Sequence, residues 1–194
     1  ERLRMTLLDM AHAEGFNRSA EDVTIGRLLQ FGLAPALKQN FEEIQRAPYL
    51  IQMLLAEINH EGTAEFFRVN YDGYWEKFNR GTVIAGDSKV SERIQKTIEN
   101  TDFVALTLNK SIQSALHIWE EGRKKPKLEE EPDSSTESND EVDDETEGYP
   151  TDLKDAFERW NLEVAVLNNS TGRKCLYRSL SANEVSAVQS EMTR

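Results

Sequence analysis

Apolar residues recur every three or four positions through most of the first 122 residues, and this spacing predicts a succession of helices. The predicted helices lie near 1–14, from Ser19 to Gly32, from Pro35 onward, from Pro48 to Gly62, over 89–100 and over 103–121. The helix predicted from Pro48 carries apolar side chains around much of its circumference. We therefore expect it at the centre of the core.

The segment EFFRVNYDGYWEKF, residues 65–78, holds six of the sixteen aromatic residues of the chain. We expect two short helical pieces here, separated by the breaking pair Asp72-Gly73. The rings suit either a buried core or an exposed surface that binds a partner, because large aromatic side chains dominate both. The candidate partner-binding residues of this segment are Phe67, Tyr71, Tyr74, Trp75 and Phe78.

Beyond Pro150, apolar residues recur at alternating intervals of four and three over two heptads. This seam comprises Leu153, Phe157, Trp160, Val164 and Leu167, of which the first four are further partner-binding candidates. A seam this short does not fold alone, so we expect it to dock on the N-terminal domain, on a second copy or on a partner.

The remaining C-terminal segment has one ambiguous and one clear element. The run RKCLYRSL fits a short helix, or a strand that pairs with LEVAVL as a hairpin near 162–178. A capping box, Ser181 to Glu184, predicts a last helix. The sequence thus predicts an all-α fold. Its parts are a helical domain over 1–122, a basic-then-acidic linker over 123–149, and a C-terminal helical segment over 150–194.

The chain has 194 residues and a formal net charge of −12. This excess of acid argues against wholesale nucleic-acid binding, which needs clustered Lys and Arg to replace phosphate counterions. The single cysteine, Cys175, allows no internal disulfide and indicates a reducing compartment, the cytosol or the nucleus. No apolar run approaches the length of a membrane span, so we expect no membrane partner.

A basic cluster opens the linker, at the end of the helix predicted over 103–121. Its members are Arg123, Lys124, Lys125 and Lys127. Short exposed basic runs of this kind serve as nuclear import signals, and basic side chains at a helix C-terminus also favour the helix dipole. The two interpretations are compatible.

Eleven acidic residues follow in the linker without a compensating cation. This tract fits a solvated tether, because such composition cannot bury a core. It also fits a binding site for a basic partner such as a histone tail. Ser134 and Ser138 stand before acidic residues and are candidate phosphorylation sites of acid-directed kinases.

We find no catalytic, cofactor-binding or metal-binding constellation in the sequence. GTVIAGDS, residues 81–88, carries Asp87 where a phosphate-binding loop needs Lys, so a loop that caps the next helix through Asp87 or Ser88 explains it better. None of the three histidines has a second ligand at metal spacing. Cys175 lies beside two basic residues, but nothing local supplies the His and carboxylate of a catalytic triad.

These observations favour a non-enzymatic protein–protein interaction module, a scaffold or adaptor in an intracellular complex, with the nucleus preferred. A second hypothesis is an acidic, chaperone-like binder of basic proteins, with its function in residues 129–147. A third is an enzyme whose site is assembled from residues scattered in sequence. We expect no cofactor and no direct nucleic-acid contact, and we leave open whether two copies associate.

Overall fold

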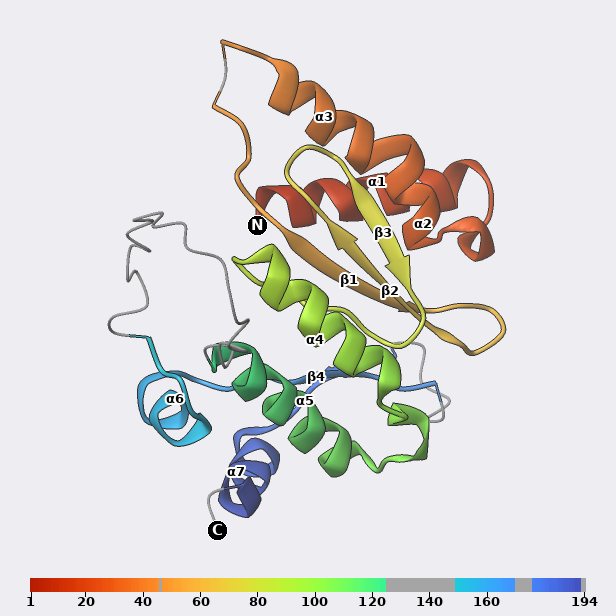
Figure 1. Cartoon of the computed structure of the whole chain (residues 1–194). Helices are drawn as coiled ribbons and strands as arrows, with labels where there is room; N and C mark the ends of the chain where they lie inside the picture. The colour runs from red at the N-terminus through yellow and green to blue at the C-terminus, as the bar shows by residue number, and fades with distance from the viewer. Residues whose placement is uncertain (46, 125–148, 170–175, 193–194) are drawn as a thin grey trace, which may run out of the picture. The chain divides into compact units, whose positions relative to one another are not determined.

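The computed structural model describes residues 1–45, 47–124, 149–169 and 176–192, which contain both helices and strands (Figure 1). The elements, in chain order, are α1 (Arg2–Asn17), η1 (Ala20–Asp22), α2 (Ile25–Leu28), η2 (Leu29–Leu33), α3 (Ala34–Glu42), β1 (Met53–Ile58), β2 (Ala64–Val69), β3 (Trp75–Phe78), α4 (Ser88–Asn100), η3 (Phe103–Ala105), α5 (Leu108–Arg123), α6 (Leu153–Arg159), β4 (Ala165–Leu167), β5 (Tyr177–Ser179) and α7 (Ala182–Met192). The strands form one three-stranded and one two-stranded antiparallel sheet. The prediction of an all-α fold is therefore wrong.

The chain divides into two compact units that interleave in sequence. Unit 1 comprises Glu1–Ala105 and Ala165–Ser179, and unit 2 comprises Leu106–Val164 and Leu180–Arg194. The sequence predicted consecutive regions instead. The segment beyond Pro150 is shared between the units, because its hairpin belongs to unit 1 while α6 and α7 belong to unit 2.

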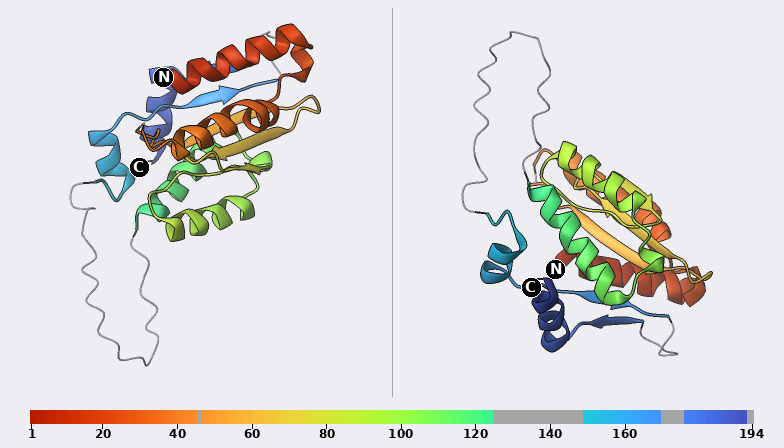
Figure 2. Two further views of the ribbon diagram at one scale, coloured as in Figure 1. Left: turned by 90° about the horizontal axis from the view of Figure 1, so that it is seen from above. Right: turned by 60° about the horizontal axis from the view of Figure 1, so that its bottom comes forward.

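In unit 1, the sheet has the strand order β1-β2-β3 and lies between two layers of helix. Helices α1, α2 and α3 cover one face, and α4 covers the other (Figures 1 and 2). The view from above in Figure 2 separates these layers clearly. A sheet of three strands has two edges, and β1 is one of them.

The core of unit 1 forms where a helical stripe meets the first face of the sheet. Leu29, Leu33 and Leu37 recur at intervals of four and are buried against Phe67 and Val69 of β2. Residues four apart share one face of a helix, so the stripe is continuous from α2 through η2 into α3. The match between this stripe and one sheet face holds the layers together through apolar burial.

The stripe passes through one turn of π-helix, η2, immediately before Pro35. The Ala34 N–H donates to the carbonyl of Leu29, five residues back, instead of four. Pro35 cannot donate to the preceding turn and its ring crowds that turn, so a wider turn relieves the conflict. The sequence predicted that one helix ends at Gly32 and another begins at Pro35, whereas the structure continues the helical path across both.

Gly32 stands where α1 approaches this path most closely. A Cβ at position 32 would lie 2.7 Å from the Met10 sulfur of α1, closer than real Cβ contacts come. Only glycine therefore lets the two helices approach this closely without a shift of the Met10 side chain.

The second face of the sheet is held to α4 through an arginine. The Arg68 guanidinium donates to Ser91 Oγ at 2.9 Å and to the Val83 carbonyl at 3.3 Å. It also pairs with Glu76 on the neighbouring strand and lies 5.2 Å from the centre of the Phe78 ring. This network connects β2, β3 and α4 around one side chain.

The helix predicted from Pro48 to Gly62 is wrong, and residues 53–58 form strand β1. Along β1 the side chains alternate between half-buried and exposed, with Leu55 packed on the core and Leu54 exposed. Apolar residues on both faces of a short segment fit a helix and a strand equally well. Pairing with β2 decides between them, as Leu55 lies opposite Phe67.

The two short helical pieces predicted within residues 65–78 are also wrong. They are strands β2 and β3, paired antiparallel with Phe67 opposite Lys77. Asp72-Gly73 forms the turn between them, and Gly73 adopts a positive φ of 83°. Asp-Gly between two apolar runs is a strong hairpin signal, because glycine takes the left-handed conformation that tight turns need.

The seam predicted beyond Pro150 is interrupted after one short helix. Helix α6 ends at Arg159, and the chain becomes extended before β4. Strand β4 pairs antiparallel with β5, which confirms the hairpin alternative. The capping box is also confirmed, because Glu184 accepts from the Ser181 N–H at 2.9 Å at the start of α7.

Unit 2 consists of α5, α6 and α7. Glu120 of α5 accepts the Leu153 N–H at the start of α6, and Gln113 of α5 donates to Glu191 of α7 at 2.7 Å. Leu153 and Val188 are buried. Across the described ranges of both units, no helix is long and apolar enough to cross a membrane.

Candidate interaction surface

Large apolar side chains are exposed together at one end of unit 1. We call this set the apolar end; its members are Phe41 near the end of α3, Ile44 just after α3, Leu50 and Ile51 before β1, and Tyr71 and Tyr74 in the β2–β3 turn. Ile44 is fully exposed, Leu50 is 79% exposed and Tyr74 is 57% exposed. Figure 1 shows that the end of α3, the approach to β1 and the β2–β3 turn lie at the same end of the sheet.

Hydrogen bonds hold the three segments of the apolar end together. Asn40 Oδ1 accepts the Tyr49 N–H at 3.0 Å, which ties the approach to β1 to α3. Gln52 donates to Asn70 at 3.0 Å, which ties the same approach to the β2–β3 turn. These bonds hold Tyr49 on α3 and Gln52 on the β2–β3 turn, beside the exposed rings and aliphatic side chains.

The β2–β3 turn packs directly on α3. The Phe41 and Tyr71 rings are 5.4 Å apart, and a Cβ on Gly73 would lie 2.4 Å from the Ala34 carbonyl oxygen. Glycine is required at position 73 for two reasons, its positive φ and this close approach. The turn thus places Tyr71 and Tyr74 beside the end of α3.

Strand alternation separates the five aromatic residues that the sequence grouped as partner-binding. Phe67 is 1% exposed, and Trp75 packs on it with ring centres 6.1 Å apart, so both belong to the core. Phe78 is half-buried on the opposite face beneath Arg68. Only Tyr71 and Tyr74 are well exposed, and they join the apolar end.

Sequence reasoning missed the four aliphatic and aromatic members outside the turn. Phe41 and Ile44 fall in the helix predicted from Pro35 onward, and Leu50 and Ile51 fall in the helix predicted from Pro48 to Gly62, which we expected at the centre of the core. The sequence offered one signal of this exposure. Ile44, at the end of the helix predicted from Pro35 onward, lies so close to Pro48 that little chain remains to bury it.

The seam residues of unit 2 have different environments. Leu153 is buried, Phe157 and Val164 are half-buried, and Trp160 is exposed just after α6. The Trp160 ring makes edge contacts with Trp119 of α5 at 6.3 Å and with Tyr149 at 6.1 Å. Trp160 is therefore already engaged within unit 2.

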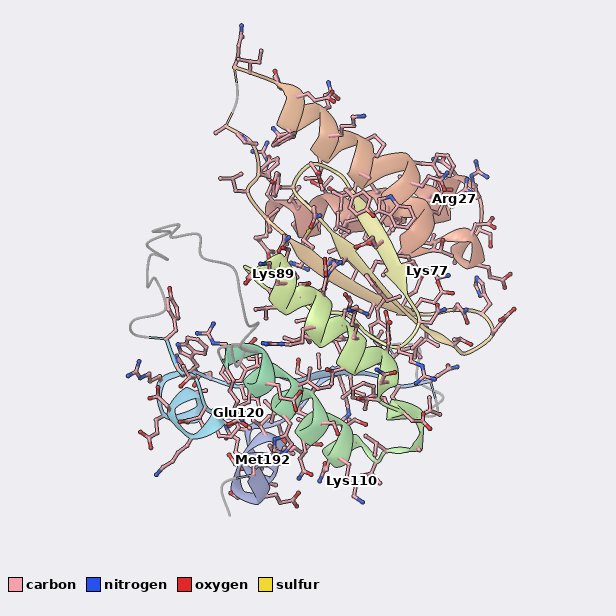
Figure 3. The ribbon with its side chains drawn as sticks, in the orientation of Figure 1. Arg27, Lys77, Lys89, Lys110, Glu120 and Met192 are labelled. Carbon is pink, nitrogen blue, oxygen red and sulfur yellow. The ribbon has the colours of Figure 1, made fainter. Side chains whose placement is uncertain are left out.

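Arg123 of the basic cluster takes part in this aromatic group. Its guanidinium lies 5.9 Å from the Trp119 ring and 5.6 Å from the Tyr149 ring, and its Nε–H donates to the Pro150 carbonyl at 3.1 Å. Glu120, labelled in Figure 3, pairs with Lys124 at 3.3 Å. These contacts join the end of α5 to the chain that leads into α6.

Several predicted sites lie outside the described residues. They are Lys125 and Lys127 of the basic cluster, the acidic tract with Ser134 and Ser138, and Cys175.

The glycine-containing loop before α4 serves as a helix cap. Asp87 accepts the Lys89 N–H at 2.8 Å at the start of α4, as the sequence predicted. Within the part of the chain that the structure describes, no group of three or more His, Cys, Asp or Glu side chains could hold a metal ion. His60 contacts the carbonyl of Glu21 at 2.6 Å and ties the β1–β2 turn to η1.

No family model matches the chain, and no curated protein matches it.

Proposed function

We propose that this protein is a non-enzymatic protein–protein interaction module, a scaffold or adaptor in an intracellular complex, and that its partner docks on the apolar end of unit 1. The observation that carries the proposal is the exposure of six large apolar side chains on three segments that hydrogen bonds join to one another.

The composition of the apolar end suits an interface. Contiguous exposed apolar surface on a folded protein marks sites of interaction, and tyrosine is among the residues that contribute most binding energy. A fixed backbone adds affinity because less conformational entropy is lost on association. Exposing Ile44, Leu50 and Tyr74 to water costs free energy that a partner would recover.

The location of the complex is part of the proposal. The single cysteine favours a reducing compartment, and the basic cluster at the end of α5 favours nuclear import. Arg123 is engaged with aromatic rings, so an import carrier would read chiefly the lysines of the cluster.

The proposal is tested with a double substitution at the apolar end, Ile44→Asp/Leu50→Asp. Both side chains are largely exposed, so the unfolding free energy should change by less than about 0.5 kcal/mol per site. Buried carboxylates in an interface are costly, so partner capture should fall at least about tenfold. Capture is measured with the purified full chain and the partner it retains, identified by mass spectrometry.

The matched control is Phe16→Asp/Val104→Asp, which adds the same charge at two exposed apolar sites of unit 1 outside the apolar end. We expect this variant to keep partner capture. Full capture by a folded Ile44→Asp/Leu50→Asp protein would overturn the proposal. Light scattering on both variants shows whether the partner is a second copy of the chain.

A further inference from the structure

The other end of the same sheet carries an open hollow of about 580 Å³. The hollow lies on the sheet face that carries the core, where the side chains of that face change from apolar to charged. Glu57 is opposite Glu65, and Phe67 is opposite Lys77, so these side chains share the face with Trp75. The helical wall of the hollow comes from η1 and α2. Figure 3 shows Arg27 on α2 and Lys77 on β3 at this end.

Two like charges directly opposite each other in a sheet destabilise it unless each has a partner. Glu65 pairs with Lys77 at 2.8 Å and accepts from Asn59 at 3.0 Å, and these contacts lower the pKa of the Glu65 carboxyl. One oxygen of Glu57 accepts the Ile25 N–H at 2.8 Å, at the start of α2. These contacts hold both carboxylates at fixed positions.

The hollow retains an excess of negative charge after these contacts. Glu57 has a second oxygen without a hydrogen bond to any described residue, and Glu21 and Asp22 form no ion pair within the described ranges. Of the two basic side chains in the lining, Arg27 already pairs with Glu14, and Lys77 already pairs with Glu65.

Aromatic rings form another part of the wall. Phe31 is 69% exposed, and the Arg27 guanidinium lies 5.3 Å from the centre of its ring. Trp75 is half-buried at the rim. The hollow therefore already contains one guanidinium, that of Arg27, against an aromatic ring. The carboxylates beside it can accept hydrogen bonds from a second guanidinium.

We propose that this hollow receives the side chain of an arginine from a basic segment of the protein partner. Guanidinium is planar, pairs with carboxylates through two hydrogen bonds and stacks on aromatic faces, and the hollow offers both kinds of contact. The inference rests on the proposed function and adds the chemistry of the partner. The partner would present apolar residues to one end of the sheet and an arginine to the other.

The test is a titration of the isotope-labelled full chain, followed by NMR. The probe is the peptide acetyl-Gly-Arg-Gly-amide, and its counterpart carries citrulline, which has nearly the same shape without the charge. We expect saturable shifts of amides in residues 21–31, 57–67 and 75–77 with arginine and none with citrulline. Equal shifts with both peptides, or shifts confined to other residues, would overturn the inference.

A charge-reduced variant, Glu21→Gln/Glu57→Gln, tests the role of the carboxylates. The glutamine at position 57 keeps an oxygen for the Ile25 N–H, so the start of α2 stays capped. We expect the arginine peptide to bind about fivefold more weakly, because two exposed charge contacts together contribute about that much to affinity. The control Asp9→Asn/Glu92→Gln has the same net charge and should bind as the wild type does. Equal weakening by both variants would contradict the assignment.

The titration requires no protein partner, and it follows the amide shifts of residues outside the apolar end. Its failure would therefore remove the arginine site and leave the proposed interaction function standing. Conversely, undiminished partner capture by Ile44→Asp/Leu50→Asp would overturn the proposed function and leave the titration unaffected.

Discussion

The two ends of the three-stranded sheet in unit 1 are built from the same strands and present opposite chemistry. At the end with the β2–β3 turn, apolar side chains such as Tyr74 in the turn and Ile44 after α3 are exposed. At the β1–β2 turn, Glu57, Glu65 and Lys77 lie on the face that forms the core elsewhere. The comparison teaches that the core extends along one face to the strand ends beside the β2–β3 turn, where Val69 is buried, and gives way to charged side chains toward the β1–β2 turn. Both ends are surfaces at which we propose that a partner binds.

Phe67 marks the boundary between the core and the charged end, and its truncation should have the largest effect. Phe67→Ala should lower the unfolding free energy by about 3–5 kcal/mol, because it removes a fully buried ring from the contact with Leu29 and Leu33. Phe31→Ala, on the wall of the hollow, should cost less than about 1 kcal/mol. Urea denaturation of both variants measures the contrast, and similar losses would show that the hollow is part of the core.

Gly73→Ala tests how rigidly the apolar end is held. The new Cβ would combine a disfavoured positive φ with a 2.4 Å approach to Ala34, so we expect a loss of about 2 kcal/mol or more. Gly86→Ala is the matched control, since no atom lies within 4 Å of its Cβ position and the loss should be near zero. Thermal and urea unfolding measure the two stabilities. An unchanged stability of Gly73→Ala would show that the turn is not fixed against α3.

The charged end should make a smaller, pH-dependent contribution. Hydrogen bonds from Lys77 and Asn59 lower the pKa of Glu65 in the folded chain, so the unfolded chain binds the proton more readily. The stabilisation is thus fully present above the unfolded pKa of about 4.3 and is lost as pH falls through the lower folded pKa. Lys77 is partly exposed, so the contribution should be less than about 1 kcal/mol.

Lys77→Met should therefore flatten the stability profile of the protein between pH 5 and pH 3, because it removes the main partner of Glu65. Lys89→Met, at an exposed site on α4 labelled in Figure 3, makes the same chemical change elsewhere. Urea midpoints measured across this range provide the comparison. Identical profiles for the two variants would mean that the Glu65–Lys77 pair does not contribute.

The sequence predicted the helical layers better than the sheet. Capping residues around α4 and α7, Asp87 and Ser181, act locally, and the structure confirms them. Strand β1 depends on its partner, because the segment MLLAEI carries no periodicity that excludes a helix. The turn signals Gly62 and Asp72-Gly73 were present, but the sequence interpretation treated them as helix ends.

The candidate surface was predictable only in part, for a related reason. The clustering of aromatic residues in one segment singled out Tyr71 and Tyr74, and the structure shows that both side chains are exposed. Deciding that Phe67 and Trp75 are core residues required the two-residue period of a strand, which places alternate rings on opposite faces. Exposure at Ile44 and Leu50 depends on where α3 ends relative to β1, for which the sequence offers only the short distance between Ile44 and Pro48.

The most direct test of the central claim is site-specific photocrosslinking in cells, with a benzophenone amino acid placed at Tyr74. A matched protein carries the same group at Tyr177, which is equally exposed but lies in the β4–β5 hairpin. The account predicts a discrete protein adduct from position 74 that is absent from position 177 and that disappears in the Ile44→Asp/Leu50→Asp background. No adduct at position 74, or the same adducts from both positions, would contradict the claim that the apolar end binds a partner.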